Sequence, residues 1–274
     1  MRPHAPFVLL DDARPGGAPA RLYRDPAGIV EARDLAAVRP ALDALRRART
    51  NGLHAAGFVA YEAGAAFEPA VPAGEGAEPL LWFGLFDGWE ELPTGLVPSA
   101  LPDPAGAWIG ALDPCVDPDA YAAAFGRVAE LIRAGDLYQA NLSFRARVPV
   151  MGDPLAVYRA LRGSAGAGWG AVVATGEATH LSFSPELFFH LDGRRITCRP
   201  MKGTARRETG PVADRAAAAA LAGDAKQRAE NLMIVDLIRN DLSRVAIAGS
   251  VAVPELFTVE SYPTVHQMVS AVTA

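Results

Sequence analysis

The segment from Ala229 to Leu242, AENLMIVDLIRNDL, constrains the fold more than any other. At about 100° per residue, its apolar side chains fall on every face of the helix that the segment predicts, and a helix that is apolar all round is expected to be buried. Yet it also carries Glu230, Asp236 and Arg239. Buried charges are costly unless they are paired or bind a metal. The segment therefore predicts either an internal ion-pair network, for example Asp236 with Arg239, or a carboxylate that binds Mg²⁺, and spacing alone favours the ion pairs.

A second segment, SPELFFHLDGRRITCRPMKGT from Ser184 to Thr204, predicts a β-hairpin because Asp-Gly separates two strand-like runs. Glu186 follows one strand, and Lys202 stands near the end of a later one, before Gly203. A lysine in an apolar setting can act as a nucleophile, and a nearby carboxyl group can serve as general acid or base. The same pattern also fits an exposed Lys202 at a strand end.

The order of the remaining elements predicts the fold class. Residues 1–112 predict short strands around a helix over 32–51, and residues 113–274 predict helices that begin after Asp117, near 213 and at 225, with a half-buried strand over 142–148. Strands and helices do not alternate regularly, which favours an α+β architecture over a doubly wound sheet. We expect two parts, 1–112 and 113–274, joined by a Pro- and Gly-rich crossing loop.

Composition excludes several functional classes. The formal net charge is −5 and no basic patch is present, so a nucleic-acid partner is not expected. No stretch approaches the roughly 20 apolar residues of a membrane-spanning helix. Two cysteines do not make a disulfide framework, so a cytoplasmic protein is expected.

Several segments occur in an order that resembles the chorismate-utilising enzymes, a family that includes anthranilate synthase component I, aminodeoxychorismate synthase component I and isochorismate synthases. The resemblance rests on RAGDLYQANLS, SPELFF, TCRPMKGTARR, AKQRAENLMIVDLIRNDLSRVAIAGSV and VESYPTVHQMVS. Lys202-Gly203-Thr204 is typical of the aminodeoxychorismate synthase branch, whereas anthranilate synthases typically have Ala at the first of these positions. The resemblance implies two packed antiparallel sheets with flanking helices. It also implies a fold incomplete at the C-terminus, because later family segments are absent.

The resemblance also implies a reaction and its residues. Lys202 would attack C2 of chorismate, and Glu186 would protonate the departing C4 hydroxyl and then act as base. Ammonia from a separate glutamine amidotransferase subunit would then add at C4, giving 4-amino-4-deoxychorismate. Gly203 and Thr204 would contact the substrate, and Glu230 would be one Mg²⁺ ligand.

Two departures keep other functions open. Gln267 stands where many relatives have His, with His266 one place earlier, and the chain ends in what the pattern suggests is a helix. The alternatives are an anthranilate or isochorismate synthase activity within the family, or a non-catalytic remnant that binds the glutaminase partner. A pyridoxal-phosphate enzyme that uses Lys202 is a more distant alternative.

Overall fold

A computed structural model describes residues 6–68, 70–72 and 78–274, and the chain divides into two compact units. Unit 1 comprises Met1–Asp103 and Pro154–Glu186, and unit 2 comprises Pro104–Asp153 and Leu187–Ala274. Each unit combines helices with antiparallel sheets, so the α+β prediction is confirmed. Packing divides the chain at three places rather than at one boundary near residue 112, because two later strands join the first sheet.

A five-stranded antiparallel sheet forms the centre of unit 1, in the order β12-β11-β1-β2-β6. Its strands are β1 (Phe7–Asp11), β2 (Ala20–Arg24), β6 (Glu90–Leu92), β11 (Trp169–Ala174) and β12 (Thr179–Ser184). Because side chains alternate along a strand, Leu9 and Leu22 face one cluster while Val8 and Tyr23 face another. The sheet is therefore buried on both faces.

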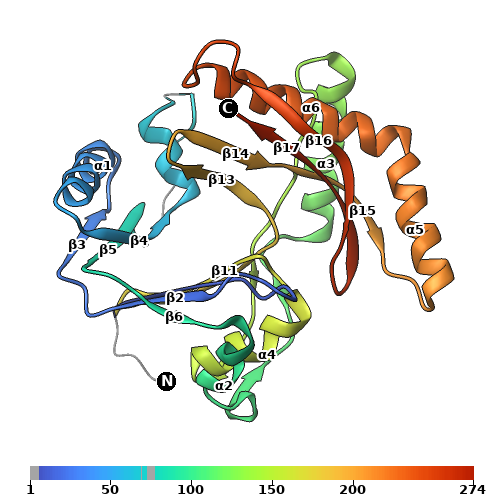
Figure 1. Cartoon of the computed structure of the whole chain (residues 1–274). Coiled ribbons are helices and arrows are strands. Elements are labelled where there is room, and N and C mark those ends of the chain that lie inside the picture. Colours follow the sequence, from blue (N-terminus) through green and yellow to red (C-terminus); the bar gives the residue numbers. More distant parts are fainter. Residues whose placement is uncertain (1–5, 69, 73–77) are drawn as a thin grey trace. The chain divides into compact units, whose positions relative to one another are not determined.

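Helices and a second sheet complete unit 1. The three-stranded sheet has the order β3-β5-β4, with β3 (Gly28–Ala32), β4 (His54–Val59) and β5 (Leu81–Phe86). Helix α1 (Leu35–Thr50) packs against it (Figure 1), and the side chain of Asp34 caps the helix by accepting from the Ala37 N–H at 2.8 Å. The other helices are α2 (Val97–Ala100), α4 (Pro154–Ala165) and the 3₁₀ turns η1 (Tyr61–Ala66) and η2 (Thr94–Leu96).

The main sheet of unit 2 is built on the last strand. Strand β17 (Val265–Thr273) pairs with β14 (Arg195–Arg199), β15 (Met201–Arg206) and β16 (Ala252–Ser261), and β13 (Leu187–Asp192) pairs with β14. The predicted hairpin of β13 and β14 is confirmed. The expectation of a helix at the end of the chain is wrong. The segment is rich in valine, a β-branched residue that favours strands, and it has antiparallel partners from β14, β15 and β16.

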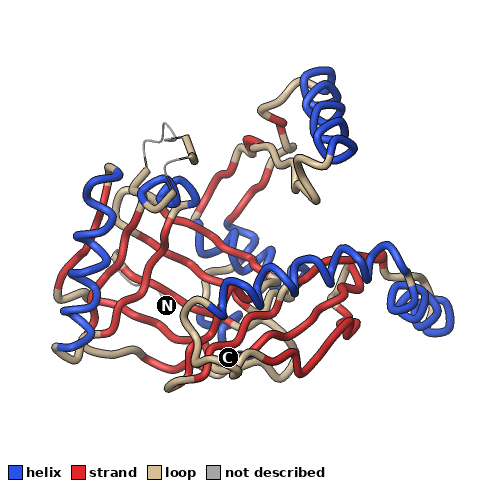
Figure 2. Tube along the Cα trace, turned by 90° about the horizontal axis from the view of Figure 1, so that it is seen from above, coloured by secondary structure: helices blue, strands red, loops and turns tan. Residues whose placement is uncertain are grey.

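Helices α5 (Pro211–Gly223) and α6 (Ala225–Ser243) lie along this sheet, and both views show α6 running beside its strands (Figures 1 and 2). Helix α6 buries Asn231, Val235 and Leu242 on one face. Leu237 on another face is 54% exposed, so the prediction of a helix buried all round is wrong: the sheet covers one face only. The predicted pair of Asp236 with Arg239 forms at 2.9 Å, but at the surface.

Helix α3 (Pro118–Ala134) begins and ends as predicted. The side chain of Asp117 caps it, and Gly135 ends it with a left-handed φ of 84°. None of its residues is buried, and Figure 2 shows it standing away from the main sheet of unit 2.

The predicted half-buried strand over 142–148 is wrong. Only β9 (Ala146–Arg147) is strand there; it is exposed, and its pairing with β8 (Asp113–Pro114) extends over two residues. The remaining elements of unit 2 are β7 (Ala107–Ile109), which pairs with β10 (Val150–Gly152), and the turn η3 (Pro104–Gly106). Among the described residues, no helix combines the length and apolar character needed to cross a bilayer.

Candidate functional site

The Lys202 segment forms a β-bulge in β15, where this strand pairs with β17. Met201 pairs with Val269 and Thr204 pairs with Gln267, so Lys202 and Gly203 together stand opposite a single residue, Met268. A bulge of this kind bends the strand and re-aims its side chains, and bulges are common next to active sites. The sequence predicts Lys202 near the end of a strand, whereas the structure places it at the second residue of β15, within the bulge.

Glycine is required at position 203. Its φ of +102° lies in a region that side-chain-bearing residues rarely adopt. A Cβ there would also lie 3.1 Å from Cβ of Met268 and 3.2 Å from Cβ of Gln227. Gly203 therefore determines the conformation of the bulge. The bulge in turn determines the path of the backbone at Lys202.

The Lys202 side chain is half-buried and forms no ion pair with another described residue. The chain has one other lysine, Lys226, whose side chain is 80% exposed and lies 3.7 Å from a carboxylate oxygen of Glu230. A half-buried amine without an anionic neighbour can present its lone pair to a ligand once it loses its proton.

Gln267 is beside the bulge, and His266 is not. The Thr204 hydroxyl donates to Oε1 of Gln267 at 3.0 Å, which places both side chains on one face of the sheet. Neighbouring residues in a strand point to opposite faces. Accordingly His266 is buried elsewhere, with Nδ1 2.9 Å from Oγ of Ser261 and Nε2 3.0 Å from Oδ1 of Asp214. His266 therefore does not substitute for a histidine at position 267.

A buried carboxamide beneath the bulge is a feature that sequence reasoning missed. The Nδ2 group of Asn231 donates to the carbonyl oxygens of Lys202 at 3.3 Å and Met268 at 3.2 Å. Its Oδ1 accepts from the hydroxyl of Ser270 at 2.6 Å. The sequence did carry a signal for its burial. Asn231 stands four residues before the apolar Val235, so both lie on one face of the helix.

The two predicted acidic residues are placed separately. Glu186 is the exposed last residue of unit 1, and its carbonyl accepts from the Ser184 hydroxyl at 3.0 Å. Glu230 is half-buried on α6 in unit 2. The structure thus brings Lys202, Gly203 and Thr204 together in one strand, whereas Glu186 is placed only within its own unit.

Glu230 by itself does not form a metal site. In the parts of the chain that the structure describes, no three His, Cys, Asp or Glu side chains gather closely enough to hold a metal ion. Mg²⁺ is commonly bound through one or two carboxylates, with substrate and water completing its shell. A role of Glu230 as a Mg²⁺ ligand therefore stays a prediction.

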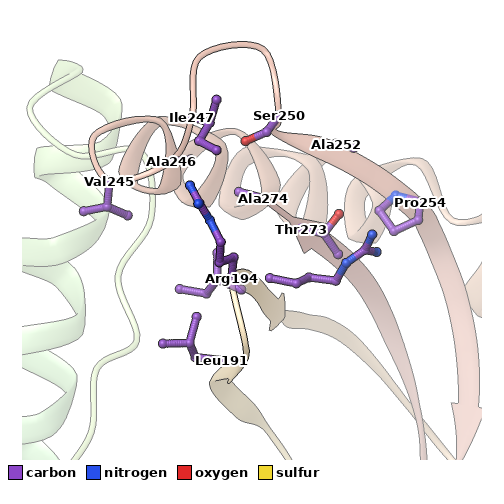
Figure 3. Close-up of a pocket in the computed structure, with 12 residues that line it drawn as sticks. Leu191, Arg194, Val245, Ala246, Ile247, Ser250, Ala252, Pro254, Thr273 and Ala274 are labelled. Atoms are coloured by element: carbon purple, nitrogen blue, oxygen red, sulfur yellow. The ribbon is translucent and has the colours of Figure 1, made fainter. Parts of the chain in front are cut away.

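A cavity of about 870 Å³ lies elsewhere in unit 2, between the β13–β14 turn and the loop after α6 (Figure 3). Arg194, Val245, Ile247 and Pro254 are among its lining residues, and none of the five predicted site residues lines it. The candidate site is therefore the bulge and not this cavity.

A family model described as chorismate binding enzyme matches residues 6–274, nearly the whole chain. The chain belongs to this family. The expectation from the sequence motifs is thereby confirmed at the level of the family.

Members of the family with related sequences include two kinds of enzyme. Over 154 residues, or 56% of this chain, it is 46% identical to aminodeoxychorismate synthase component 1 of Salmonella typhimurium. Over the same length it is 41% identical to anthranilate synthase component 1 of Thermus thermophilus. These matches cover 34% and 33% of those proteins, so the aligned part of the chain spans about a third of their length.

Solved structures in the family share the fold. Anthranilate synthase component I from Streptococcus pneumoniae superposes with a TM-score of 0.76 at 21% identity, covering 100% of this chain and 70% of that one. A 2,3-dihydroxybenzoate-specific isochorismate synthase from Bacillus anthracis gives a TM-score of 0.69 at 17% identity, covering 97% and 67%. At these identities the likeness shows the fold alone.

Proposed function

We propose that this member of the chorismate-binding family acts in the aminodeoxychorismate synthase branch and converts chorismate and ammonia into 4-amino-4-deoxychorismate and water. The observation that carries the proposal is Lys202, held in a bulge that requires Gly203. The 46% identity to aminodeoxychorismate synthase component 1 supports the same branch. Component 1 in that relative's name implies a second component, and we propose a glutamine amidotransferase subunit as the source of ammonia.

Lys202 supplies the nucleophile in the proposed reaction. The neutral amine forms a bond to C2 of chorismate, both conjugated ring double bonds shift by one position, and the C4–oxygen bond breaks. Glu186 donates the proton with which the hydroxyl leaves as water. Ammonia then forms a bond to C4, both double bonds shift back, and the bond between C2 and Nζ breaks. Glu186 accepts a proton from the new ammonium group, which regenerates the enzyme.

The neighbours of Lys202 bind and orient the substrate in this proposal. Gly203 lets the substrate approach the backbone closely, and the exposed Thr204 hydroxyl contacts it. Glu230 would share Mg²⁺ with a carboxylate of chorismate, where the ion offsets negative charge.

An anthranilate synthase activity is the second candidate, favoured by the 41% identity to the Thermus thermophilus enzyme. The two activities differ in where nitrogen enters the ring and in whether a lysine adduct forms. Lys202 favours the aminodeoxychorismate branch, because an anthranilate-type reaction leaves its amine without a role.

The test is intact-mass and product analysis of the chain with chorismate, Mg²⁺ and ammonium. We expect 4-amino-4-deoxychorismate from the wild-type chain and none from Lys202→Ala. Lys226→Ala is the matched control, because it removes the only other lysine from an exposed position. Product that persists in Lys202→Ala would refute the role of the lysine, and anthranilate as the product would move the chain to the other branch.

A further inference from the structure

We infer that Asn231 is a positioning residue for Lys202, acting through the carbonyl oxygens on both sides of the bulge. This inference rests on the proposed function, since Lys202 matters as a nucleophile only there. Asn231 touches the backbone of Lys202 and not its amine.

The carboxamide of Asn231 uses both of its ends. Nδ2 donates to the Lys202 carbonyl on β15 and to the Met268 carbonyl on the facing strand β17, at 3.3 and 3.2 Å. Oδ1 accepts from the Ser270 hydroxyl at 2.6 Å, and Ser270 Oγ in turn accepts from the Phe257 N–H of β16 at 3.1 Å. One side chain of α6 thus connects to three strands of the sheet.

The position of this network matches the defect that a bulge creates. An extra residue in one strand disrupts the ladder of backbone hydrogen bonds and leaves a group unpaired. An unpaired buried carbonyl is costly. Asn231 supplies the missing donor at the level of Lys202 and Met268, so the bulge is satisfied only when this carboxamide is present and correctly oriented.

Burial makes the network stiff. Asn231 and Ser270 are both fully buried, at 0% exposure. Water therefore cannot easily replace either partner, and each hydrogen bond lost would leave a buried polar group unsatisfied. Ser270 fixes which end of the carboxamide faces the bulge, because its hydroxyl donates to Oδ1 while accepting from Phe257.

The consequence concerns the geometry of the Lys202 amine. Gly203 permits the bulge, and Asn231 holds its carbonyl in place from beneath. A small displacement of a reacting group can cost about 100-fold in rate. Loss of the Asn231 donor is thus expected to misplace the amine while leaving the substrate contacts of Thr204 largely unchanged.

Two variants and one matched control test the inference. Asn231→Asp keeps the shape and the acceptor for Ser270 but, when ionised, loses the donor to Lys202. Ser270→Ala keeps the donor but removes the hydroxyl that orients it. Val235→Ala, one turn along the same buried face of α6, removes apolar packing without touching the network.

The first readout does not need turnover. Trace acetylation of the folded chain with acetic anhydride, followed by peptide mass spectrometry, gives the labelling of Lys202 relative to Lys226 as an internal reference. We expect this ratio to rise about threefold or more in Asn231→Asp and less in Ser270→Ala, since local opening exposes the half-buried amine. Val235→Ala should leave the ratio unchanged.

The second readout is steady-state formation of 4-amino-4-deoxychorismate. Asn231→Asp should lower kcat about tenfold or more with a smaller change in KM, because a misplaced amine affects the transition state more than binding. If Asn231→Asp does not fold, Ser270→Ala decides by the same two readouts.

An unchanged labelling ratio in both network variants would overturn the inference, as would an equal rise in Val235→Ala. A wild-type chain that forms no product would refute the proposed function for this chain. The labelling ratio would still decide whether Asn231 holds the Lys202 segment.

Discussion

Unit 1 and unit 2 are both built from helices and antiparallel sheets, but they differ in how completely they bury their apolar side chains. The sheets of unit 1 are covered by three apolar clusters, and its central sheet is buried on both faces. In unit 2 two smaller clusters cover the sheet beneath α6 and near Tyr262, α3 buries no residue, and most of the exposed large apolar side chains of the described chain lie there. The candidate site is therefore on the less completely packed unit, where its geometry depends on local devices such as Gly203 and Asn231.

Unit 1 also contains a buried pair of oppositely charged side chains. In unit 1, Arg162 binds Asp11 through two hydrogen bonds of 2.6 and 2.9 Å, and the Tyr158 hydroxyl donates to the same carboxylate at 3.0 Å. Burial, together with the nearby charge of Asp11, raises the pKa of Tyr158 well above its ordinary value. The hydrogen bond to Asp11 raises the pKa of Arg162.

The largest effect on stability is expected from this buried pair. Arg162→Ala leaves the carboxylate of Asp11 buried without its cationic partner, which should lower the free energy of unfolding by about 3–5 kcal/mol. The exposed pair of Arg239 with Asp236 in unit 2 provides the control, since Arg239→Ala should cost less than about 1 kcal/mol. Urea unfolding followed by circular dichroism measures both. Equal losses would contradict the contrast between the units.

A matched leucine pair tests the packing itself. Leu22 in the unit 1 sheet is fully buried, whereas Leu237 on α6 is half exposed. Leu22→Ala should destabilise by about 2–5 kcal/mol, and Leu237→Ala by about 0.5 kcal/mol or less. A large loss for Leu237→Ala in the same unfolding assay would mean that the exposed face of α6 is covered in solution.

The helix caps give a smaller effect that distinguishes global from local stability. Asp34→Ala and Asp117→Ala each remove a side chain that accepts from the first turn, worth about 1 kcal/mol. Helix α1 packs on a core cluster and α3 does not. Loss of Asp34 should therefore lower global stability, while loss of Asp117 should mainly speed amide exchange within α3. Hydrogen exchange with mass spectrometry separates these outcomes, and protection of α3 equal to that of α1 would contradict them.

Much of the local structure could be predicted from the sequence because it depends on local chemistry. The cap of Asp117, the stop at Gly135 and the Asp192-Gly193 turn each require only a few adjacent residues. The family could be predicted as well, since several motifs occur together in one order, and the family model confirms it.

The errors came from properties that depend on neighbours distant in sequence. The burial of α6 is one-sided because the sheet covers one face, which periodicity cannot reveal. Residues 142–148 alternate as a strand does, but few partner residues lie beside them. The role of Asn231 could not be predicted from its place in an apolar helix, since that role depends on a bulge whose register is set by β15 and β17. The role of Glu186 and the Mg²⁺ ligand at Glu230 stay predictions.

Acid should lower the stability of unit 2 through a partly exposed cluster of polar groups around Asp214. Three hydrogen bonds from Arg207, together with the Glu208 N–H, hold the pKa of Asp214 well below its ordinary value of 3.8. A carboxylate whose pKa is depressed by folding stabilises the native state above its unfolded pKa, and the stabilisation is lost as pH falls from that value through the folded pKa. The cluster also receives His266 of β17, so Asp214 links α5 to the strand that carries Gln267.

Asp214→Asn keeps the size of the side chain and removes this titration. The wild-type chain should lose stability relative to the variant as pH falls from about 5 to about 3, and the two curves should be parallel above about pH 5. The effect should be smaller than that of either cap variant, because solvent screens the pair. Urea midpoints across this range measure it. A wild-type chain that instead gained stability relative to the variant as pH fell would mean that the carboxylate is destabilised by folding. The link between α5 and β17 would then have to rest on Arg207 and His266 without an ionised Asp214.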